Sequence, residues 1–254
     1  MKKMQKILLL LSVILAGSGV VIANTDNLHP KSINWNFDGA FGTFDRTSIQ
    51  RGFQVYKEVC SACHSLKLIS FRNLIEIGFS EAEAKEIAKS YNVKDGPNDE
   101  GEMFERPAIL SDYFPGPYAN EKAARATNNG AFPVDLSLVI RARENGANYV
   151  YSLLTGFNQP VPEGVVIGEN MHYNPYFPGM QIAMSPPLSD NIVQYTDGTK
   201  ATVDQMSRDV VNFLQWTSDT KMEKRKVMGI KVFLFLLIFT GLFFVAKKRV
   251  WKDI

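Results

Sequence analysis

Two cysteines and a histidine stand next to one another near residue 60, in the order Cys60-Ser61-Ala62-Cys63-His64. The 254-residue chain holds no other cysteine. Two thiols at this spacing can each add across one vinyl group of a porphyrin, and the adjacent imidazole can then bind the iron as its proximal ligand. The pattern therefore predicts one covalently bound haem c, with Cys60 and Cys63 as its anchors and His64 as a metal ligand.

Two other kinds of site also use a close pair of cysteines. A thioredoxin-like dithiol normally opens a helix after a strand, whereas the apolar periodicity here puts the pair at the end of a helical stretch. A structural zinc site needs two further ligands, and the only other histidines are His29 and His172. The sequence therefore favours haem over a redox dithiol and over zinc.

An iron that only exchanges electrons needs a sixth ligand, so that small molecules do not bind it. His172 is one candidate and would lower the redox potential relative to a methionine ligand. Prolines stiffen the segment from residue 178 to residue 187, which favours Met180 or Met184 as the thioether donor. The residues alone leave the choice open among four methionines, which are Met103, Met171, Met180 and Met184.

Two helices are predicted to position the haem site. Residues 49–59 have helical apolar periodicity, and Gly52 on this helix allows another backbone to come close. Residues 203–216 carry a matching apolar stripe after a capping box formed by Thr202 and Gln205. We expect these helices, one near each end of the exported part, to cross and pack against each other.

The sequence between these two helices is predicted to form shorter helices and long loops. A helix is predicted over residues 81–91, opened by a capping box that starts at Ser80. A helix pair is predicted over residues 136–155, with a break near Gly146. Two segments rich in Pro, Gly and Asn are predicted as loops, and loops of this length are usually functional; they are residues 92–120 and 156–190.

The two ends of the chain carry export and membrane signals. Lysines followed by an apolar run with small residues predict a signal peptide over residues 1–23. Residues 227–246 are long and apolar enough for one transmembrane helix, and a basic cluster follows them. We therefore expect residues 24–220 to form one domain on the periplasmic side of a bacterial inner membrane, with a cytoplasmic tail at 247–254.

The exported part is acidic, although the whole chain is nearly neutral. Residues 24–220 hold 16 Lys and Arg against 24 Asp and Glu, and residues 71–121 alone hold 11 acids against 5 bases. Such a charge distribution attracts a basic protein partner and repels nucleic acid. The alternative is that these acids form only a solvated face.

Beyond the haem motif, the chain resembles the cytochrome c1 family from about residue 35 through the C-terminal anchor. The resemblance implies a mainly α-helical, cytochrome c-type haem domain with long loops, plus one C-terminal transmembrane helix. It is carried by several strings, which are MFERP from residue 103, LSDYF from 110, ATNNGA from 126, DLS from 135, YVYSLLTG from 149 and YNPYFPG from 173.

The resemblance also implies roles for single residues. In the family pattern the distal methionine directly precedes a segment of the form x-Pro-Pro, which selects Met184 as the second axial ligand. Arg106 is expected to approach a haem propionate, where a guanidinium can pair with a carboxylate through two hydrogen bonds. Tyr113 is expected to border the same region. Residues 132–135 read Phe-Pro-Val-Asp where many relatives read Pro-Pro-Asp, and we attach no functional consequence to this difference.

The implied function is outer-sphere electron transfer, without substrate chemistry of the chain's own. In the family, an electron comes from quinol at cytochrome b through the Rieske iron–sulfur protein. It passes through the haem of this subunit and goes on to a soluble basic cytochrome c. Two other functions are open to such a haem protein: a five-coordinate gas sensor, and a free-standing anchored cytochrome that serves an oxidase.

Overall fold

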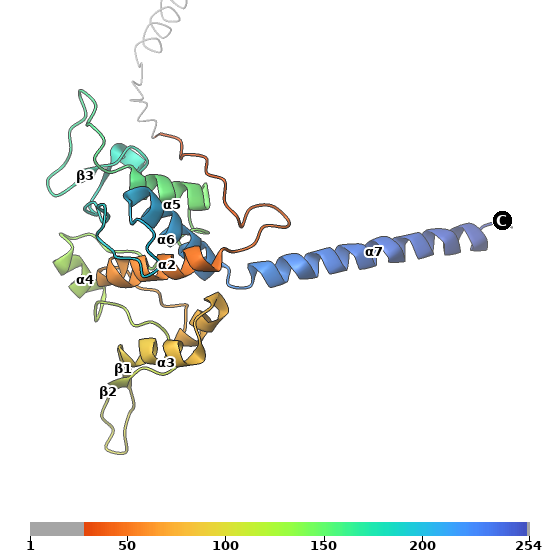
Figure 1. The fold of residues 1–254 in the computed structure, drawn as a ribbon, viewed down its shortest axis with the longest axis horizontal. Coiled ribbons are helices and arrows are strands. Elements are labelled where there is room, and N and C mark those ends of the chain that lie inside the picture. The colour runs from red at the N-terminus through yellow and green to blue at the C-terminus, as the bar shows by residue number, and fades with distance from the viewer. Residues whose placement is uncertain (1–27, 253–254) are drawn as a thin grey trace, which may run out of the picture.

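Two crossing helices form the centre of the domain. The computed structural model describes residues 28–252. Helix α2 (Arg46–Glu58) and helix α6 (Val203–Ser218) lie against each other and bury their shared face (Figure 1). The helices predicted from apolar periodicity are thus confirmed, with small shifts at their ends. Thr202 caps α6 as expected, because its side chain accepts a hydrogen bond from the N–H of Gln205.

Gly52 is the point of closest approach between α2 and α6. A Cβ atom at this position would lie 2.0 Å from the backbone oxygen of Asp209. The rings of Phe53 and Phe213 pack across the same crossing with their centroids 5.6 Å apart. The prediction that Gly52 allows a close backbone approach is therefore confirmed.

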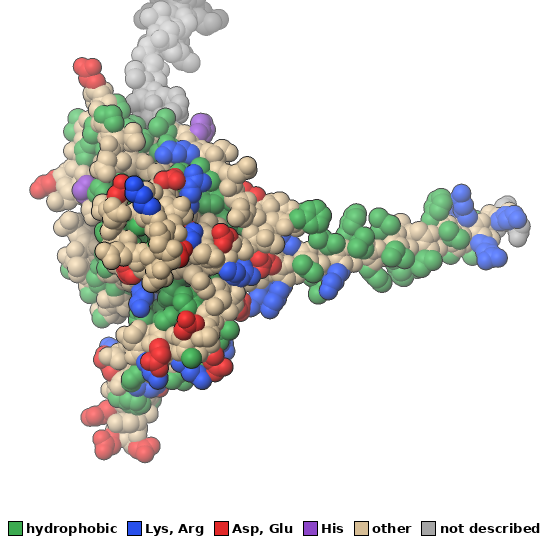
Figure 2. Space-filling view, viewed as in Figure 1, with side chains coloured by type: hydrophobic (Ala, Val, Ile, Leu, Met, Phe, Trp, Pro, Cys, Tyr) green, Lys and Arg blue, Asp and Glu red, His purple; other side chains and the backbone are tan. Residues whose placement is uncertain are grey.

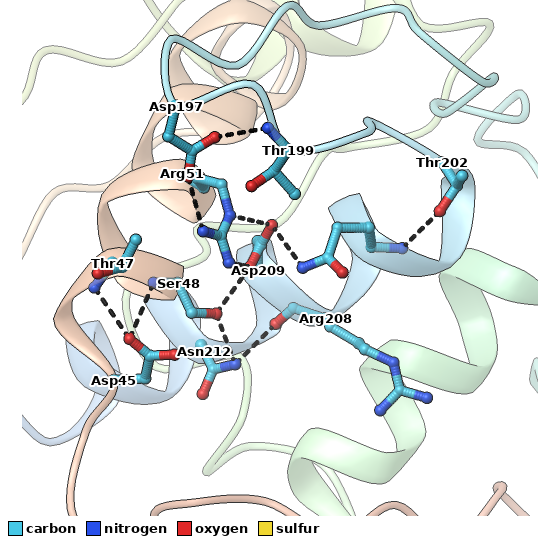
Figure 3. A network of polar contacts seen from close by, with 11 residues as sticks. Asp45, Thr47, Ser48, Arg51, Asp197, Thr199, Thr202, Arg208, Asp209 and Asn212 are labelled. Carbon is cyan, nitrogen blue, oxygen red and sulfur yellow. Dashed lines mark hydrogen bonds and ion pairs between the residues drawn. The ribbon is translucent and has the colours of Figure 1, made fainter.

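A buried ion pair lies on the same crossing (Figure 3). Arg51 of α2 donates two hydrogen bonds of 2.9 Å to the carboxylate of Asp209, which is fully buried on α6. Ser48 donates to the same carboxylate at 2.7 Å, and Asp197 accepts from the other side of the guanidinium at 2.9 Å. Loss of one partner would leave a buried charge without compensation, so this pair favours one register of the two helices.

The other helices surround this crossing. The capped helix predicted from residue 81 is confirmed as α3 (Glu81–Lys89), with a capping box between Ser80 and Glu83. Helix α5 (Gly146–Thr155) packs against α6. The sequence does not predict two short elements, which are the 3-10 helix η2 (Phe71–Ile77) and helix α4 (Glu121–Thr127).

The predicted helix pair at residues 136–155 is wrong in its first half. Only α5 is helical, and the preceding residues 136–142 form consecutive turns. The carbonyl of Ser137 accepts a hydrogen bond from Ser218 Oγ at 3.2 Å, and the N–H of Arg141 donates to Leu138 instead of to Ser137. Only one i to i−4 hydrogen bond forms in this segment, from the N–H of Ala142 to the carbonyl of Leu138 at 3.0 Å. The tertiary bond at Ser137 and the i to i−3 bonds interrupt the ladder that an α-helix requires.

Each of the two predicted long loops contains a short antiparallel pair of strands. Strands β1 (Asn92–Asp95) and β2 (Phe104–Pro107) form a hairpin that projects from the domain (Figure 1). Strand β3 (His172–Tyr173) pairs with β4 (Gln181–Ile182), which directly follows the 3-10 turn η3 (Pro178–Met180). The rest of both segments is irregular apart from η3, so the loop prediction is confirmed in outline and wrong at the strands.

Helix α7 (Met222–Val250) extends away from the domain (Figure 1). It includes the predicted span at 227–246 and is the one helix within residues 28–252 that is long and apolar enough to cross a membrane. Glu223 fastens its first turn to the domain by accepting hydrogen bonds from the Phe44 N–H at 2.8 Å and from Arg46 at 2.5 Å. The predicted signal peptide at 1–23 lies outside the described residues.

Candidate functional site

The two cysteines lie in a tight turn at the carboxyl end of α2. The 3-10 turn η1 (Cys60–Ala62) begins one residue after this helix, with Val59 between them. The carbonyl of Cys60 accepts hydrogen bonds from the N–H of Cys63 at 3.1 Å and from the N–H of His64 at 2.9 Å. Both thiols are free of disulfide bonding. The turn thus gathers two thiols and one imidazole, and it ends a helix, as the sequence predicts.

A distant segment of backbone holds the imidazole of His64. Its Nδ1 atom lies 2.7 Å from the carbonyl oxygen of Val134. Because a carbonyl only accepts hydrogen bonds, Nδ1 carries the proton, and the neutral ring keeps its lone pair on Nε2. Histidines that bind metals use this arrangement, because the second hydrogen bond sets both the tautomer and the orientation of the ring.

Burial sets the protonation of these groups. Burial, with a smaller contribution from Cys63, raises the pKa of the Cys60 thiol to about 12. Burial also lowers the pKa of His64 below its ordinary value, although the Val134 carbonyl and Asp135 act in the opposite direction. At neutral pH the imidazole is therefore uncharged, which is the form that can bind a metal.

Sequence reasoning does not identify Val134, because every residue type offers a backbone carbonyl. The segment is brought to the site by the hydrogen bond from the Leu136 N–H to the Ser65 carbonyl, at 2.9 Å. The string DLS from residue 135, one of those that carry the family resemblance, is the signal that could have directed attention here.

Arg106 lies on β2, and its guanidinium is paired with two carboxylates of the chain itself. Its Nε donates to Asp95 at 2.5 Å, and its two terminal nitrogens donate to Asp112 at 2.7 and 3.1 Å. The hydrogen bond with Arg106 lowers the pKa of both carboxyls. These contacts give Arg106 a structural role at the base of the hairpin, and its approach to a propionate stays a prediction.

Tyr113 lies in a segment that pairs with the chain shortly after the haem motif. Ser70 and Tyr113 form an isolated antiparallel bridge, and the N–H of Phe114 donates to the carbonyl of Ile69 at 3.0 Å. The side chain of Tyr113 is 54% exposed. Its proposed place beside a propionate stays a prediction.

The candidates for the second axial ligand lie on different elements. Met184 is half-buried and follows β4, and Met180 ends η3 with a positive φ of 57°. His172 is held in the β3–β4 pair, opposite Ile182. Met103 is 62% exposed and directly precedes β2. The assignment of Met184 as the ligand stays a prediction.

The donor set fits a haem better than either alternative. Across residues 28–252, no three His, Cys, Asp or Glu side chains gather as a metal cluster, so the zinc alternative gains no ligands there. The cysteine pair follows a helix instead of opening one, unlike a thioredoxin-like site. Two free thiols beside an imidazole whose Nε2 keeps its lone pair are the donors that covalent haem attachment and iron ligation need.

Comparison with known proteins gives a consistent family. A model of the cytochrome C1 family matches residues 35–254. Cytochrome b/c1 of Bradyrhizobium diazoefficiens is 50% identical over 252 residues, which cover 91% of this chain and 37% of that protein. Cytochrome c1 of Rhodospirillum rubrum is 43% identical over 256 residues, which cover 95% of this chain and 94% of that protein. A mitochondrial protein of Arabidopsis thaliana, cytochrome c1 1, heme protein, is 55% identical over 203 residues.

The extent of these matches differs among the relatives. The chain spans 37% of the Bradyrhizobium protein and 66% of the Arabidopsis protein, but 94% of the Rhodospirillum protein. The region matched by the family model contains the cysteine turn, the segment that holds His64 and helix α7. The chain therefore belongs to the cytochrome c1 family.

Proposed function

We propose that this chain is the electron-transfer subunit of a quinol:cytochrome c oxidoreductase, the cytochrome bc1 complex. It accepts single electrons from a Rieske iron–sulfur protein and passes them to a soluble basic cytochrome c. Cytochrome b is its partner in the membrane. The chain itself makes and breaks no substrate bonds. The proposal rests on the family, whose relatives include a protein named as a cytochrome b-c1 complex catalytic subunit.

The observation that carries the proposal is the hydrogen bond between His64 Nδ1 and the Val134 carbonyl. It leaves the lone pair of Nε2 available for a metal, on the imidazole that directly follows the two cysteines in the chain. Haem c, the cofactor of the chain, supplies an iron that cycles between two oxidation states. In our proposal Cys60 and Cys63 would hold it covalently, and His64 and Met184 would be its two protein ligands, which would leave the iron closed to small molecules.

The proposed location of the domain rests on the predicted signal peptide before it and on helix α7 after it. The predicted signal peptide would export the domain, and α7 would anchor it in the bacterial inner membrane, with the haem on the periplasmic side. The first turn of α7 is fastened to the domain through Glu223, Phe44 and Arg46. This attachment would keep the haem at a constant height above the membrane.

The β1–β2 hairpin supports the choice of a basic electron acceptor. Figure 2 shows acidic side chains gathered at its tip, away from the rest of the surface in this view. They include Asp99, Glu100 and Glu102, all exposed, and Glu105 lies on the adjoining strand. The base of the hairpin is stiffened by Arg106. Long-range attraction from such a surface raises the rate of encounter with a basic protein.

The function is tested by isolating the chain in detergent and by following its oxidation by a basic soluble cytochrome c. We expect cytochrome b and a Rieske protein to copurify with it. The bimolecular rate is expected to fall on the order of 10-fold as the Debye length shrinks from about 30 Å at 0.01 M salt to about 8 Å at 0.15 M. A haem protein purified alone would favour a free-standing cytochrome instead.

Charge reversal tests whether the hairpin is the docking surface. Glu100→Lys, Glu102→Lys and Glu105→Lys together should slow the encounter and flatten its salt dependence, with the haem spectrum unchanged. A matched control reverses three other exposed acids outside the hairpin, which are Glu144, Glu163 and Glu169. Equal effects of both triple changes would mean that only net charge matters and that the hairpin is a solvated face.

The axial ligand is tested by conservative replacement of each methionine. Met184→Leu keeps an apolar side chain of similar size but removes the sulfur, so the iron should become high-spin or recruit another ligand. The midpoint potential should fall by roughly 0.1 V or more, within the roughly 0.8 V that axial ligands span. Near-infrared spectroscopy and potentiometry measure both effects. If Met180→Leu produced this change and Met184→Leu did not, Met180 would be the ligand.

A gas sensor is the competing function, because its iron would be five-coordinate. The coordination state of the iron in the wild-type protein distinguishes electron transfer from gas sensing. A six-coordinate, low-spin iron in both oxidation states supports electron transfer, whereas binding of carbon monoxide to the reduced protein at micromolar concentration would support sensing.

A further inference from the structure

The backbone carbonyl that holds His64 belongs to a segment braced by one carboxylate. Asp135, the residue directly after Val134, accepts hydrogen bonds from Ser65 Oγ at 2.7 Å and from the Lys67 N–H at 2.9 Å. Both contacts use Oδ2. Its other oxygen, Oδ1, accepts from the N–H of Ser137 at 2.9 Å. One side chain therefore ties the chain just after His64 to the chain just after Val134.

The brace is reinforced on both sides by other hydrogen bonds. The N–H of Leu136 donates to the carbonyl of Ser65 at 2.9 Å, and the N–H of Leu68 donates to Ser137 Oγ at 3.1 Å. Ser137 is fully buried, and Ser65 is nearly so. The two segments thus form one hydrogen-bonded unit, although about 70 residues separate them along the chain.

Asp135 is held as a carboxylate in this unit. Burial by itself would raise its pKa, but the hydrogen bonds from Lys67, Ser137 and Ser65 together outweigh burial and keep the pKa below its ordinary value. An ionised carboxylate has only acceptor sites, and all three neighbours present donors. The geometry and the charge of this residue therefore agree.

We propose that Asp135 is a positioning residue for the axial histidine. By tying Val134 to the segment after His64, it keeps the Val134 carbonyl in place as the acceptor for Nδ1. The strength and direction of that hydrogen bond set the orientation of the imidazole and its basicity as an iron ligand. The inference rests on the proposed role of His64 as a ligand and adds a second residue that tunes it.

The test compares three variants with the wild-type protein, all with their haem bound. Asp135→Asn removes the charge and replaces one acceptor oxygen by an NH2 group. In either orientation of the amide, this NH2 group would face a backbone N–H, that of Lys67 or that of Ser137. Asp135→Glu keeps the charge but moves the carboxylate by one methylene, so it cannot satisfy all three donors in place. The matched control is Asp45→Ala, which removes the cap of α2, where Asp45 accepts from the N–H groups of Thr47 and Ser48.

The readouts are the midpoint potential and the electron paramagnetic resonance g-values of the oxidised iron, which report the orientation of the axial ligands. We expect both Asp135 variants to shift the g-values. The potential of Asp135→Asn should rise, because a weaker hydrogen bond at Nδ1 makes the imidazole a poorer donor to the oxidised iron. Asp45→Ala should lower the melting temperature and leave the g-values and the potential unchanged.

The alternative outcomes are distinct. If both Asp135 variants lowered the melting temperature and kept wild-type g-values and potential, Asp135 would be only a loop brace and the inference would fail. If His64→Ala left the low-spin spectrum of the wild type intact, His64 would not be the ligand, and the proposed function would fail first. A shift in potential for Asp135→Asn without any change in g-values for Asp135→Glu would also overturn the inference, because charge alone would explain it.

Discussion

Replacing Cys60 and Cys63 together by alanine is expected to leave no covalently bound haem. The chain holds no other thiol, and thioether bonds to the porphyrin vinyl groups need a sulfur on each side of the turn. Haem staining after denaturing electrophoresis measures the result, since only covalent haem survives that treatment. We expect complete loss of the stain in the double variant and retention of a reduced stain in each single variant.

The control for this experiment lies between the two cysteines. Ser61 is not a haem anchor, and its hydroxyl donates one hydrogen bond, to the carbonyl of Lys57 at 2.8 Å. Ser61→Ala should change stability by about 1 kcal/mol or less and keep the full stain. A double cysteine variant that still stained for haem would defeat the assignment of the cysteine turn as the attachment site.

The parts of the fold that the sequence predicts are those in which local signals and burial agree. Helix α2 has a buried apolar face, a capping aspartate at its start and a glycine at the point of contact. Helix α3 has a full capping box. Helix α7 has a long, predominantly apolar run with one charged residue, Lys231. In each case the residues that decide the structure lie within a few positions of one another along the chain.

The parts that the sequence does not predict depend on partners far away along the chain. Residues 136–142 have helical periodicity, but the carbonyl of Ser137 accepts a hydrogen bond from Ser218 Oγ and its hydroxyl oxygen accepts one from the N–H of Leu68. Strands β1 and β2 each hold only four residues, too few for a clear alternating pattern. Their pairing also depends on Arg106, which joins Asp95 to Asp112.

The candidate site also has a part that the sequence predicts and a part that depends on the fold. The thiols and the imidazole are adjacent along the chain, so their chemistry can be inferred from residue types alone. The acceptor for His64 is a backbone carbonyl 70 positions away, and its support by Asp135 depends on a fold that brings the two segments together. Residue types cannot indicate a role that a backbone atom performs.

The second large effect is expected for Gly52→Ala, at the crossing of α2 and α6. A methyl group there would lie 2.0 and 2.5 Å from the backbone oxygen and carbon of Asp209, and 2.8 Å from Cβ of Phe213. Alanine improves helix propensity by about 1 kcal/mol, but the obstructing backbone atoms can move only if α6 moves. That displacement would add overpacking of about 1–3 kcal/mol and would weaken the buried pair of Arg51 and Asp209.

We therefore expect Gly52→Ala to lower the free energy of unfolding by about 2 kcal/mol or more, because overpacking and the weakened ion pair together exceed the gain in helix propensity. Circular dichroism during urea unfolding of the haem-loaded protein in detergent measures it. Gly116→Ala is the matched control, since its added methyl would lie 3.5 Å from the nearest heavy atom, an ordinary contact distance. Equal unfolding midpoints for the two variants would mean that α6 can shift without weakening the buried ion pair. The register of the crossing would then be set by the aromatic packing of Phe53 and Phe213 instead of by the glycine.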